Sequence, residues 1–179
     1  MLFEEYDNKI AAKVREKTGI RNPWALPRVI KVVINMRVSE GKENRQTIDL
    51  AAKELELITG QKPQVCCAKK AISGFKLRKG DPIGLKVTLR RKKMLDFLEK
   101  LFSLALPRLR DFRGLAVQNF DREGNFNIGL KEQTIFPEID LDEIKVVRGL
   151  QVTIVTNVRD IESSRLLLET LGLPFKKEE

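Results

Sequence analysis

The chain has 179 residues, of which 42% are hydrophobic and 33% are charged, a composition that is typical of a folded globular protein and excludes an intrinsically disordered one. It carries 34 Lys and Arg against 25 Asp and Glu, a net charge of +9, so we expect an acidic partner such as a nucleic acid or an anionic membrane surface. It contains no histidine, which excludes histidine-dependent acid, base and nucleophile chemistry, removes most zinc sites and counts against an enzyme.

The first predicted elements are a helix and an extended segment. Residues 3–18 place apolar side chains at steps of four, which predicts an amphipathic helix ending at Gly19. These side chains are Tyr6, Ile10 and Val14. Residues 22–27 contain two prolines around Trp24, so they cannot continue the helix and are expected to run extended.

A strand and a second helix follow. Residues 28–38 alternate with period two, which predicts a strand with one apolar side and one polar, basic side. The apolar side consists of Ile30, Val32, Ile34, Met36 and Val38, and the polar side of Lys31, Asn35 and Arg37. Residues 44–59 return to helical spacing and stop at Gly60. The apolar side chains at this spacing are Ile48, Ala51 or Ala52, Leu55 and Ile58.

Two further strands are predicted on either side of a basic loop. A short strand at residues 64–68 and a longer one at 82–91 are separated by the loop 72–81, which contains Gly74 and Gly80. In the longer strand the apolar residues Leu85, Val87 and Leu89 alternate with Lys86, Thr88 and Arg90. One face of this strand is therefore expected to pack and the other to be cationic.

The second half of the chain continues this mixture of elements. The predictions are an apolar helix at 94–106 closing at Pro107, a basic irregular segment at 109–122, a turn at 121–124, an alternating strand at 125–133, an acidic loop at 136–144, a strand at 150–158 and a capped helix at 160–171. The side chains expected to point inward from the two strands are Phe126, Ile128, Leu130, Val152, Ile154 and Val158.

Strands and helices thus mix without the strict alternation of a doubly wound fold. This order favours the α+β class, with a mainly antiparallel sheet, helices packed on one face and a polar, basic face on the other. The chain has no repeat and no Gly/Ser-rich linker, so we expect a single domain over residues 1–179. Its N-terminal portion would span about 22–92 and its C-terminal portion about 93–175.

The positive charge is concentrated in residues 69–93. This segment holds ten Lys and Arg and one acid, Asp81, a balance of +9, so the rest of the chain sums to zero. A charge run by itself also fits a solvated surface. Its place on the polar side of a strand, beside Asn35 and Arg37 of another strand, would display cations together with hydrogen-bonding groups, which suits a structured RNA. The low aromatic content counts against a stacking platform for single strands.

The chain lacks the sequence patterns of nucleotide-binding and catalytic sites. Neither GxGxxG nor GxxxxGK[ST] occurs, and Gly80 is followed by an acid. The carboxylate pair Asp140 and Asp142 lies in an acidic loop, where a solvated role outweighs a catalytic or metal-binding one. We therefore predict no catalytic residue, no metal and no cofactor.

The location is expected to be cytoplasmic. No apolar run approaches the roughly 18 residues of a spanning helix, and the acids among the first seven residues suit neither a signal peptide nor a transit peptide. Cys66 and Cys67 are adjacent in a strand-like run, where side chains alternate in direction and are poorly placed for a shared metal or a mutual disulfide. We expect two small, buried or half-buried, reduced side chains.

Five motifs resemble one known family along nearly the whole chain, from about residue 22 to 175. They are KVVINM (31–36), ITGQKP (58–63), AKKAISGFKLRKGDPIGLKVTLR (68–90), LPRLRDFRG (106–114) and KEQTIFPEI (131–139). The family is that of the bacterial large-subunit ribosomal proteins that bind 5S ribosomal RNA, the L-five family. The resemblance implies a non-enzymatic protein in the central protuberance, monomeric within the ribosome and without a membrane partner. Its partners would be 5S rRNA, the elbow of the peptidyl-site tRNA, a small-subunit head protein and other proteins of the protuberance.

The resemblance also implies roles for particular positions. The resemblance places Asn35, Gln61, Thr88 and Arg90 at the rRNA. The charge pattern adds Arg37 and Lys86 to this rRNA-binding set. The loop 73–82 resembles the tRNA-facing loop of the family, with Ser73, Gly74, Phe75, Lys76, Arg78, Lys79 and Gly80. The intersubunit side would hold Arg110, Asp111, Phe112, Arg113, Ile135, Phe136, Pro137 and Glu138. Arg37 stands where the family commonly has glycine and could add a phosphate contact, and Cys66 with Cys67 replaces a more usual polar or basic pair.

Three other functions have less support in the sequence. A general nucleic-acid chaperone or DNA-binding module is also compatible with the charge. An enzyme acting on a phosphorylated substrate has no motif and no histidine in its favour. A peripheral membrane protein is disfavoured because the basic residues alternate along a strand and no basic amphipathic helix is present.

Overall fold

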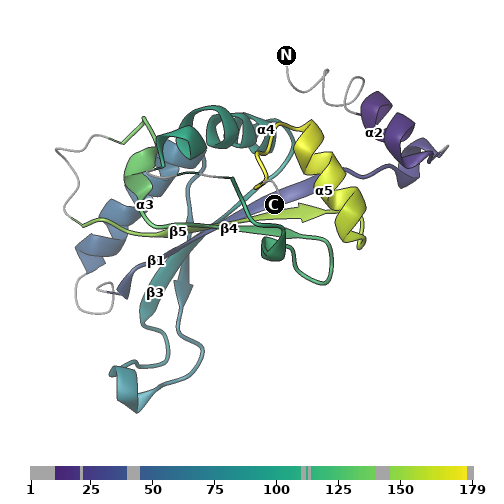
Figure 1. The fold of residues 1–179 in the computed structure, drawn as a ribbon. Helices are drawn as coiled ribbons and strands as arrows, with labels where there is room; N and C mark the ends of the chain where they lie inside the picture. The colour runs from purple at the N-terminus through teal and green to yellow at the C-terminus, as the bar shows by residue number, and fades with distance from the viewer. Residues whose placement is uncertain are drawn as a thin grey trace. The chain divides into compact units, whose positions relative to one another are not determined.

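The computed structural model describes residues 11–20, 22–39, 45–109, 112, 114–139 and 146–176 (Figure 1). Its strands are β1 (Val29–Arg37), β2 (Gln64–Cys67), β3 (Pro82–Leu89), β4 (Phe126–Leu130) and β5 (Leu150–Thr156). Its α-helices are α2 (Ala11–Thr18), α3 (Arg45–Thr59), α4 (Arg91–Lys100) and α5 (Ile161–Thr170). Shorter helical turns are η2 (Pro23–Ala25), η4 (Ser73–Phe75), η5 (Leu101–Ala105), η6 (Leu106–Arg108), η7 (Val117–Asn119) and η8 (Gln133–Ile135).

The strands form a five-stranded sheet in the order β2-β3-β1-β5-β4. The β2 and β3 strands pair antiparallel, with Gln64 opposite Lys86. The Val38 N–H donates to the Ile83 carbonyl across the far end of β1 and the near end of β3, as antiparallel neighbours require. This sheet with its helices confirms the predicted α+β class.

The chain forms two compact units. One consists of Met1–Val32, Arg90–Ile128 and Thr153–Glu179, and the other of Val33–Leu89 and Gly129–Val152. These are called unit 1 and unit 2 below. The predicted single domain, with portions at about 22–92 and 93–175, stays a prediction.

The core of unit 2 is built by α3 packing against β3, as the two amphipathic patterns require (Figure 1). The buried side chains of α3 are Ile48, Ala51, Leu55 and Ile58, and those of β3 are Leu85, Val87 and Leu89. Burial of each such aliphatic side chain contributes roughly 1.5–3 kcal/mol. The helix ends at Gly60, whose φ of +63° lies in the left-handed region that glycine adopts without strain. The helix predicted at 44–59 is thus confirmed over the described residues 45–59, and so is the alternation of buried and polar residues along β3. The strand predicted at 82–91 is two residues too long, because β3 ends at Leu89 and Arg90 lies beyond it.

The beginning of β1 departs from the predicted alternation. Val32 and the alternate residues after it are buried, but Ile30 is 46% exposed and Val29 is 6% exposed. The two buried valines are three residues apart, so the alternation is interrupted by one residue before it becomes regular. The prediction that Ile30 faces the core was therefore wrong, and Val29 occupies that role.

The α4 helix is longer than the apolar pattern predicted. It begins at Arg91 instead of residue 94, and it widens into the π-helical turn η5 before ending in η6. Pro107 lies within η6 and does not close the helix before it. Basic side chains at the helix start carry no apolar periodicity, which is why the pattern placed the start too late.

The end of β5 also differs from its prediction. The strand stops at Thr156, which is 6% exposed, and Val158 beyond it is half-buried. The Thr156 hydroxyl lies 3.1 Å from the carbonyl oxygens of Gly124 and Val158 and from the Ser164 hydroxyl. A polar residue with these partners takes the inward position that was assigned to Val158.

The α5 helix follows with the predicted cap. The Asp160 carboxylate accepts the Ser163 N–H at 2.9 Å, and hydrogen bonds from Ser163 hold the pKa of Asp160 below its ordinary value. α5 contacts α2, in which Val14 is fully buried. Tyr6 and Ile10 of the predicted first helix lie outside the described residues.

Four smaller corrections concern local structure. Residues 22–27 contain the 3-10 turn η2 instead of running fully extended, because the Ala25 N–H donates to the Asn22 carbonyl. β4 ends at Leu130, three residues before the predicted strand end, and η8 follows. The basic segment at 109–122 includes the short turn η7. Cys67 is exposed and Cys66 half-buried, since β2 is an edge strand with a register shift between them.

None of the helices in the described part of the chain has the length and apolar character required to cross a lipid bilayer.

Candidate nucleic-acid interface

One face of the β2, β3 and β1 strands in unit 2 is polar. Arg37 lies opposite Gly84, because a Cβ added to Gly84 would be 3.7 Å from the Arg37 Cα. Two residues further along each strand, Asn35 and Lys86 occupy equivalent places, and Lys86 is also paired with Gln64 of β2. The register therefore aligns Gln64, Lys86 and Asn35 in a row across three strands. We call Asn35, Arg37, Gln64, Lys86 and Thr88 the polar sheet face.

The exposure of this face follows the alternation of its strands. Lys86 and Arg37 are exposed, and Asn35 and Thr88 are half-buried. In β3 the apolar residues that alternate with Lys86 and Thr88 are buried and the strand packs against α3, and in β1 the neighbours of Asn35, Ile34 and Met36, are buried as well. The cationic groups are therefore held at a fixed spacing on a strand backbone.

Gln61 reaches this face from the end of α3. The Thr59 hydroxyl donates to the Leu55 carbonyl at 2.7 Å, and Gly60 then reverses the chain direction. The Gln61 side-chain amide donates to the Thr88 carbonyl at 3.3 Å. The ITGQ sequence thus places Gln61 next to Thr88 of β3, although Gln61 and Thr88 are 27 positions apart in the chain.

Arg90 is the last of the residues predicted at rRNA. It directly follows β3, is exposed and has extended backbone angles at the start of α4. Arg91 beside it has a φ of +52°, in the left-handed region. The next two residues, Lys92 and Lys93, are also exposed.

The loop between β2 and β3 is a hydrogen-bonded extension (Figure 1). Ile72 and Leu77 exchange two backbone hydrogen bonds, of 2.9 and 3.1 Å, around the tip turn η4. Nearer the sheet, the Ala68 N–H donates to the Asp81 carbonyl at 2.8 Å, and the Asp81 carboxylate accepts the Arg78 N–H at 2.7 Å. The loop predicted at 72–81 is thus a small hairpin with its own backbone pairing.

The predicted tRNA-facing residues all lie on this hairpin and are exposed. They are Ser73, Gly74, Phe75, Lys76, Arg78, Lys79 and Gly80. The Phe75 side chain is 71% exposed at the tip, followed by Lys76 with a φ of +49°. An exposed aromatic side chain next to a lysine offers both a stacking surface and a phosphate contact.

The predicted intersubunit residues are only partly described. Arg110, Asp111 and Arg113 lie outside the described residues, and Phe112 is half-buried. In unit 2, Ile135 is 7% and Phe136 is 1% exposed, whereas Pro137 is exposed and Glu138 half-buried. Of these four residues, only Pro137 and Glu138 are therefore accessible to a partner.

Sequence reasoning missed a buried polar cluster in unit 2. Arg148 Nη1 lies 3.5 Å from Glu54 Oε2, and the two side chains are 8% and 16% exposed. The amide of Gln133, fully buried, donates to the Val146 carbonyl at 2.9 Å, and its oxygen accepts the Arg148 N–H. Burial raises the pKa of Glu54, with Arg148 acting in the opposite direction. No local periodicity indicates this cluster, because its members come from three distant segments.

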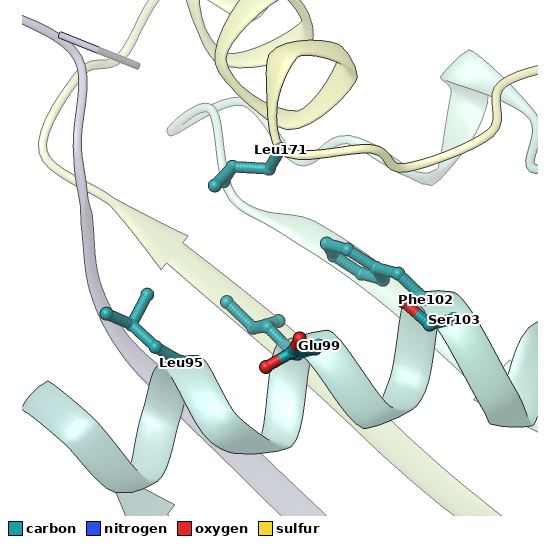
Figure 2. Close-up of a pocket in the computed structure, with 6 residues that line it drawn as sticks. Leu95, Glu99, Phe102, Ser103 and Leu171 are labelled. Atoms are coloured by element: carbon teal, nitrogen blue, oxygen red, sulfur yellow. The ribbon is translucent and has the colours of Figure 1, made fainter. Parts of the chain in front are cut away.

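A small hollow lies in unit 1 between α4 with η5 and the end of α5 (Figure 2). Its volume is about 130 Å³, and its lining is Leu95, Leu98, Glu99, Phe102, Ser103 and Leu171. Sites for small-molecule ligands usually measure roughly 300–1,000 Å³. Within the described residues, no three His, Cys, Asp or Glu side chains are grouped closely enough to hold a metal ion.

Comparison with known proteins covers nearly the whole chain. Residues 22–78 match the family model of ribosomal protein L5, and residues 82–175 match the model of the C-terminus of the same ribosomal family. The large ribosomal subunit protein uL5 of Thermus thermophilus is 52% identical over 176 residues, covering 98% of this chain and 97% of its own length. The uL5 proteins of Caldanaerobacter subterraneus and Dictyoglomus turgidum are 49% and 50% identical, with 98% and 99% of both chains covered.

Proposed function

This chain belongs to the ribosomal protein L5 family, and on that premise we propose that it binds 5S ribosomal RNA through the polar sheet face, Gln61 and Arg90. As a member of the family it is a structural constituent of the large ribosomal subunit, located in the ribosome of the cytoplasm, and not an enzyme.

The observation that carries the proposal is the placement of the charge. Residues 69–93 hold the whole net charge of +9, and Lys86 within them is exposed beside Asn35 on the face opposite the α3 packing. A face that is cationic, hydrogen-bonding and nearly free of aromatic side chains suits a folded RNA rather than an unstacked single strand.

The residues divide into two roles by their chemistry. Lys86, Arg37 and Arg90 are exposed cations that would neutralise phosphates and supply affinity. Asn35 and Thr88 carry amide and hydroxyl groups that reach ribose hydroxyls or base edges. Gln61 donates one side-chain N–H to the Thr88 carbonyl, and its second N–H and its side-chain oxygen would be the groups that contact the RNA.

The hairpin between β2 and β3 would contact a second RNA, the peptidyl-site tRNA. Its support is the exposure of Phe75, Lys76, Arg78 and Lys79 on an extension with its own backbone hydrogen bonds. The distance from the sheet gives reach, and the internal pairing limits the entropy lost on binding.

The intersubunit contact would be made by two segments that are separate in the sequence. The candidates for contact with a small-subunit head protein are Pro137 and Glu138, which are exposed and half-buried in unit 2, and the segment 110–113 of unit 1. The buried Ile135 and Phe136 and the Gln133 cluster would hold Pro137 and Glu138 in place. Other proteins of the central protuberance are further partners under this proposal.

The direct test is 5S rRNA binding by single substitutions in a filter-binding titration. Lys86→Ala and Arg90→Ala should each weaken binding about fivefold or more, equivalent to ~1 kcal/mol, because each removes a phosphate contact. Lys53→Ala is the matched control, since Lys53 is an exposed cation on α3 and outside the polar sheet face. Unchanged affinity in both variants would exclude this face as the binding surface.

A general nucleic-acid chaperone or DNA-binding module would behave differently in the same assay. Its binding to 5S rRNA would be lost to an excess of unrelated duplex at moderate salt, because phosphate contacts alone do not distinguish sequences or folds. Binding that persists against this competitor supports the 5S rRNA proposal.

A further inference from the structure

Trp24 is the single tryptophan of the chain, and its side chain is 79% exposed. It lies in η2, the short turn of unit 1 that leads into β1. A solvent-exposed indole leaves a large apolar surface in water, and tryptophan is among the residue types that most often dominate binding interfaces. Its exposure therefore points to a partner.

The turn that carries Trp24 is pinned by hydrogen bonds on both sides. Before it, the Asn22 side-chain oxygen accepts the Trp24 N–H at 3.0 Å. After it, the Asn157 side chain accepts the Arg28 N–H at 2.7 Å and donates to the Leu26 carbonyl at 2.9 Å. The backbone of Asn157 adds a third bond, to the Arg28 carbonyl at 3.1 Å.

Packing completes this support. Leu26 and Pro27, directly after the turn, are buried, so the chain on the C-terminal side of the indole is fixed in the core of unit 1. A side chain held on a fixed backbone loses less conformational entropy on binding than one on a free segment. The backbone that carries Trp24 is thus already in place before a partner binds.

The charge around the turn indicates what kind of partner it is. Residues 20–38 contain four Lys and Arg and no Asp or Glu. Arg28, four positions after Trp24, is exposed, and Lys31 is half-buried. An exposed aromatic side chain followed in the sequence by cations, in a segment without acids, suits a nucleobase flanked by phosphates better than an apolar protein surface.

We propose that Trp24 stacks on an unpaired base of the rRNA that this chain binds, with Arg28 contacting an adjacent phosphate. The inference rests on the proposed function. The stacking contact would come from unit 1 and lies outside the polar sheet face. It would recognise an exposed base instead of the shape of a duplex. A bulged or looped nucleotide provides such a base in a folded RNA.

The single tryptophan makes the test direct, because all indole fluorescence of the protein comes from Trp24. Titration of the full chain with 5S rRNA should quench this fluorescence and protect it from acrylamide. Trp24→Ala should weaken rRNA binding roughly 5- to 100-fold, the range for loss of one stacked base, and Trp24→Phe should retain most of the affinity. Leu57→Ala, at a 59% exposed apolar side chain of α3, is the matched control and should bind as the wild type does.

Each other outcome overturns the inference. Tight binding without quenching, or with equal affinity for Trp24→Ala, leaves the 5S rRNA proposal standing and excludes the stacking contact. Shielding of Trp24 that appears only in the assembled large subunit, and not with 5S rRNA, assigns the indole to a protein or to another RNA. Absence of any 5S rRNA binding by the wild type removes both proposals. Equal thermal unfolding of the wild type and the variants shows that any loss of rRNA binding is not caused by a loss of folding.

Discussion

Glu54 and Arg148 form an ion pair that is largely removed from water. The Gln133 side chain donates to the Glu54 carboxylate and to the Val146 carbonyl, and its oxygen accepts the Arg148 N–H. Carrying a carboxylate into such a site is unfavourable unless its partners compensate, and here burial still dominates, since the pKa of Glu54 is raised. The cluster ties α3 to residues on both sides of the loop that carries Pro137 and Glu138. Its role is therefore to hold the base of that loop.

The raised pKa of Glu54 predicts a pH dependence of stability. The native state binds this proton more tightly than the unfolded chain, where the pKa is near its ordinary 4.5, so the Glu54 contribution to the free energy of unfolding falls as pH rises through the raised value. Relative to Glu54→Gln, the wild type should therefore gain stability on acidification from about pH 7 to about pH 5. Urea unfolding of both proteins at the two pH values measures this difference. A constant difference would contradict it.

The burial of Thr156 and the exposure of Trp24 each depend on the surroundings of a single residue. Thr156 occupies a core position because the carbonyls of Gly124 and Val158 and the Ser164 hydroxyl satisfy its hydroxyl. Trp24, one of the largest apolar side chains, is left in water. Hydrophobicity alone predicts the opposite of both, since it contains no information on partners.

At the scale of elements, β1 and β3 pack closely at Gly84. An added Cβ there would lie 2.9 Å from the Met36 carbonyl oxygen, closer than real contacts allow. The same pairing places Arg37 and Lys86 on the polar sheet face. The glycine thus serves the spacing of the proposed interface as well as the sheet.

Gly84→Ala should lower the free energy of unfolding by about 1–3 kcal/mol, because the β1 backbone must move to admit the methyl group. Gly129→Ala is the control, since a Cβ at Gly129 in β4 meets no atom within 4 Å. Replacing glycine with alanine in a strand is there expected to be neutral or to stabilise by about 0.5–1 kcal/mol. Urea denaturation measures both, and equal effects at the two positions would refute the close approach.

The hairpin between β2 and β3 is the second element with a separable role. Replacing Lys76, Arg78 and Lys79 with serine should leave 5S rRNA binding within about twofold, because these cations lie on the hairpin and not on the polar sheet face. Positioning of peptidyl-site tRNA, followed by chemical footprinting on ribosomes that carry the variant, should be impaired. Loss of 5S rRNA affinity with intact folding would show that the two roles had been assigned to the wrong elements.

At the scale of the whole molecule, the net charge of +9 equals the charge of residues 69–93 alone. The structure divides this segment between the rigid strand β3, the hairpin before it and the start of α4. The basic residues of this segment therefore lie on three different structural elements. This arrangement lets one basic segment serve more than one contact.

The concentration of charge predicts a steep salt dependence of 5S rRNA binding. Each neutralised phosphate contributes roughly 0.7–0.9 to the slope of log K against log salt through counterion release. Lys86→Ala should reduce the magnitude of this slope by about 1, whereas Lys53→Ala should leave it unchanged. Filter-binding titrations at four or five salt concentrations give both slopes. A slope near zero for the wild type would show that phosphate contacts do not supply the affinity.

The amino-acid sequence by itself determined the α+β class, the two faces of β3, the cap of α5 and the family. These features depend on local periodicity, on turn chemistry and on contiguous motifs, which neighbouring residues carry. Tertiary structure alone decided that Ile135 and Phe136 are buried, that Gln61 bonds to Thr88, that Glu54 meets Arg148 and that Trp24 is exposed. Each of these depends on contacts between segments tens of residues apart, whose side chains compete for the same space and hydrogen-bond partners only after the chain has folded.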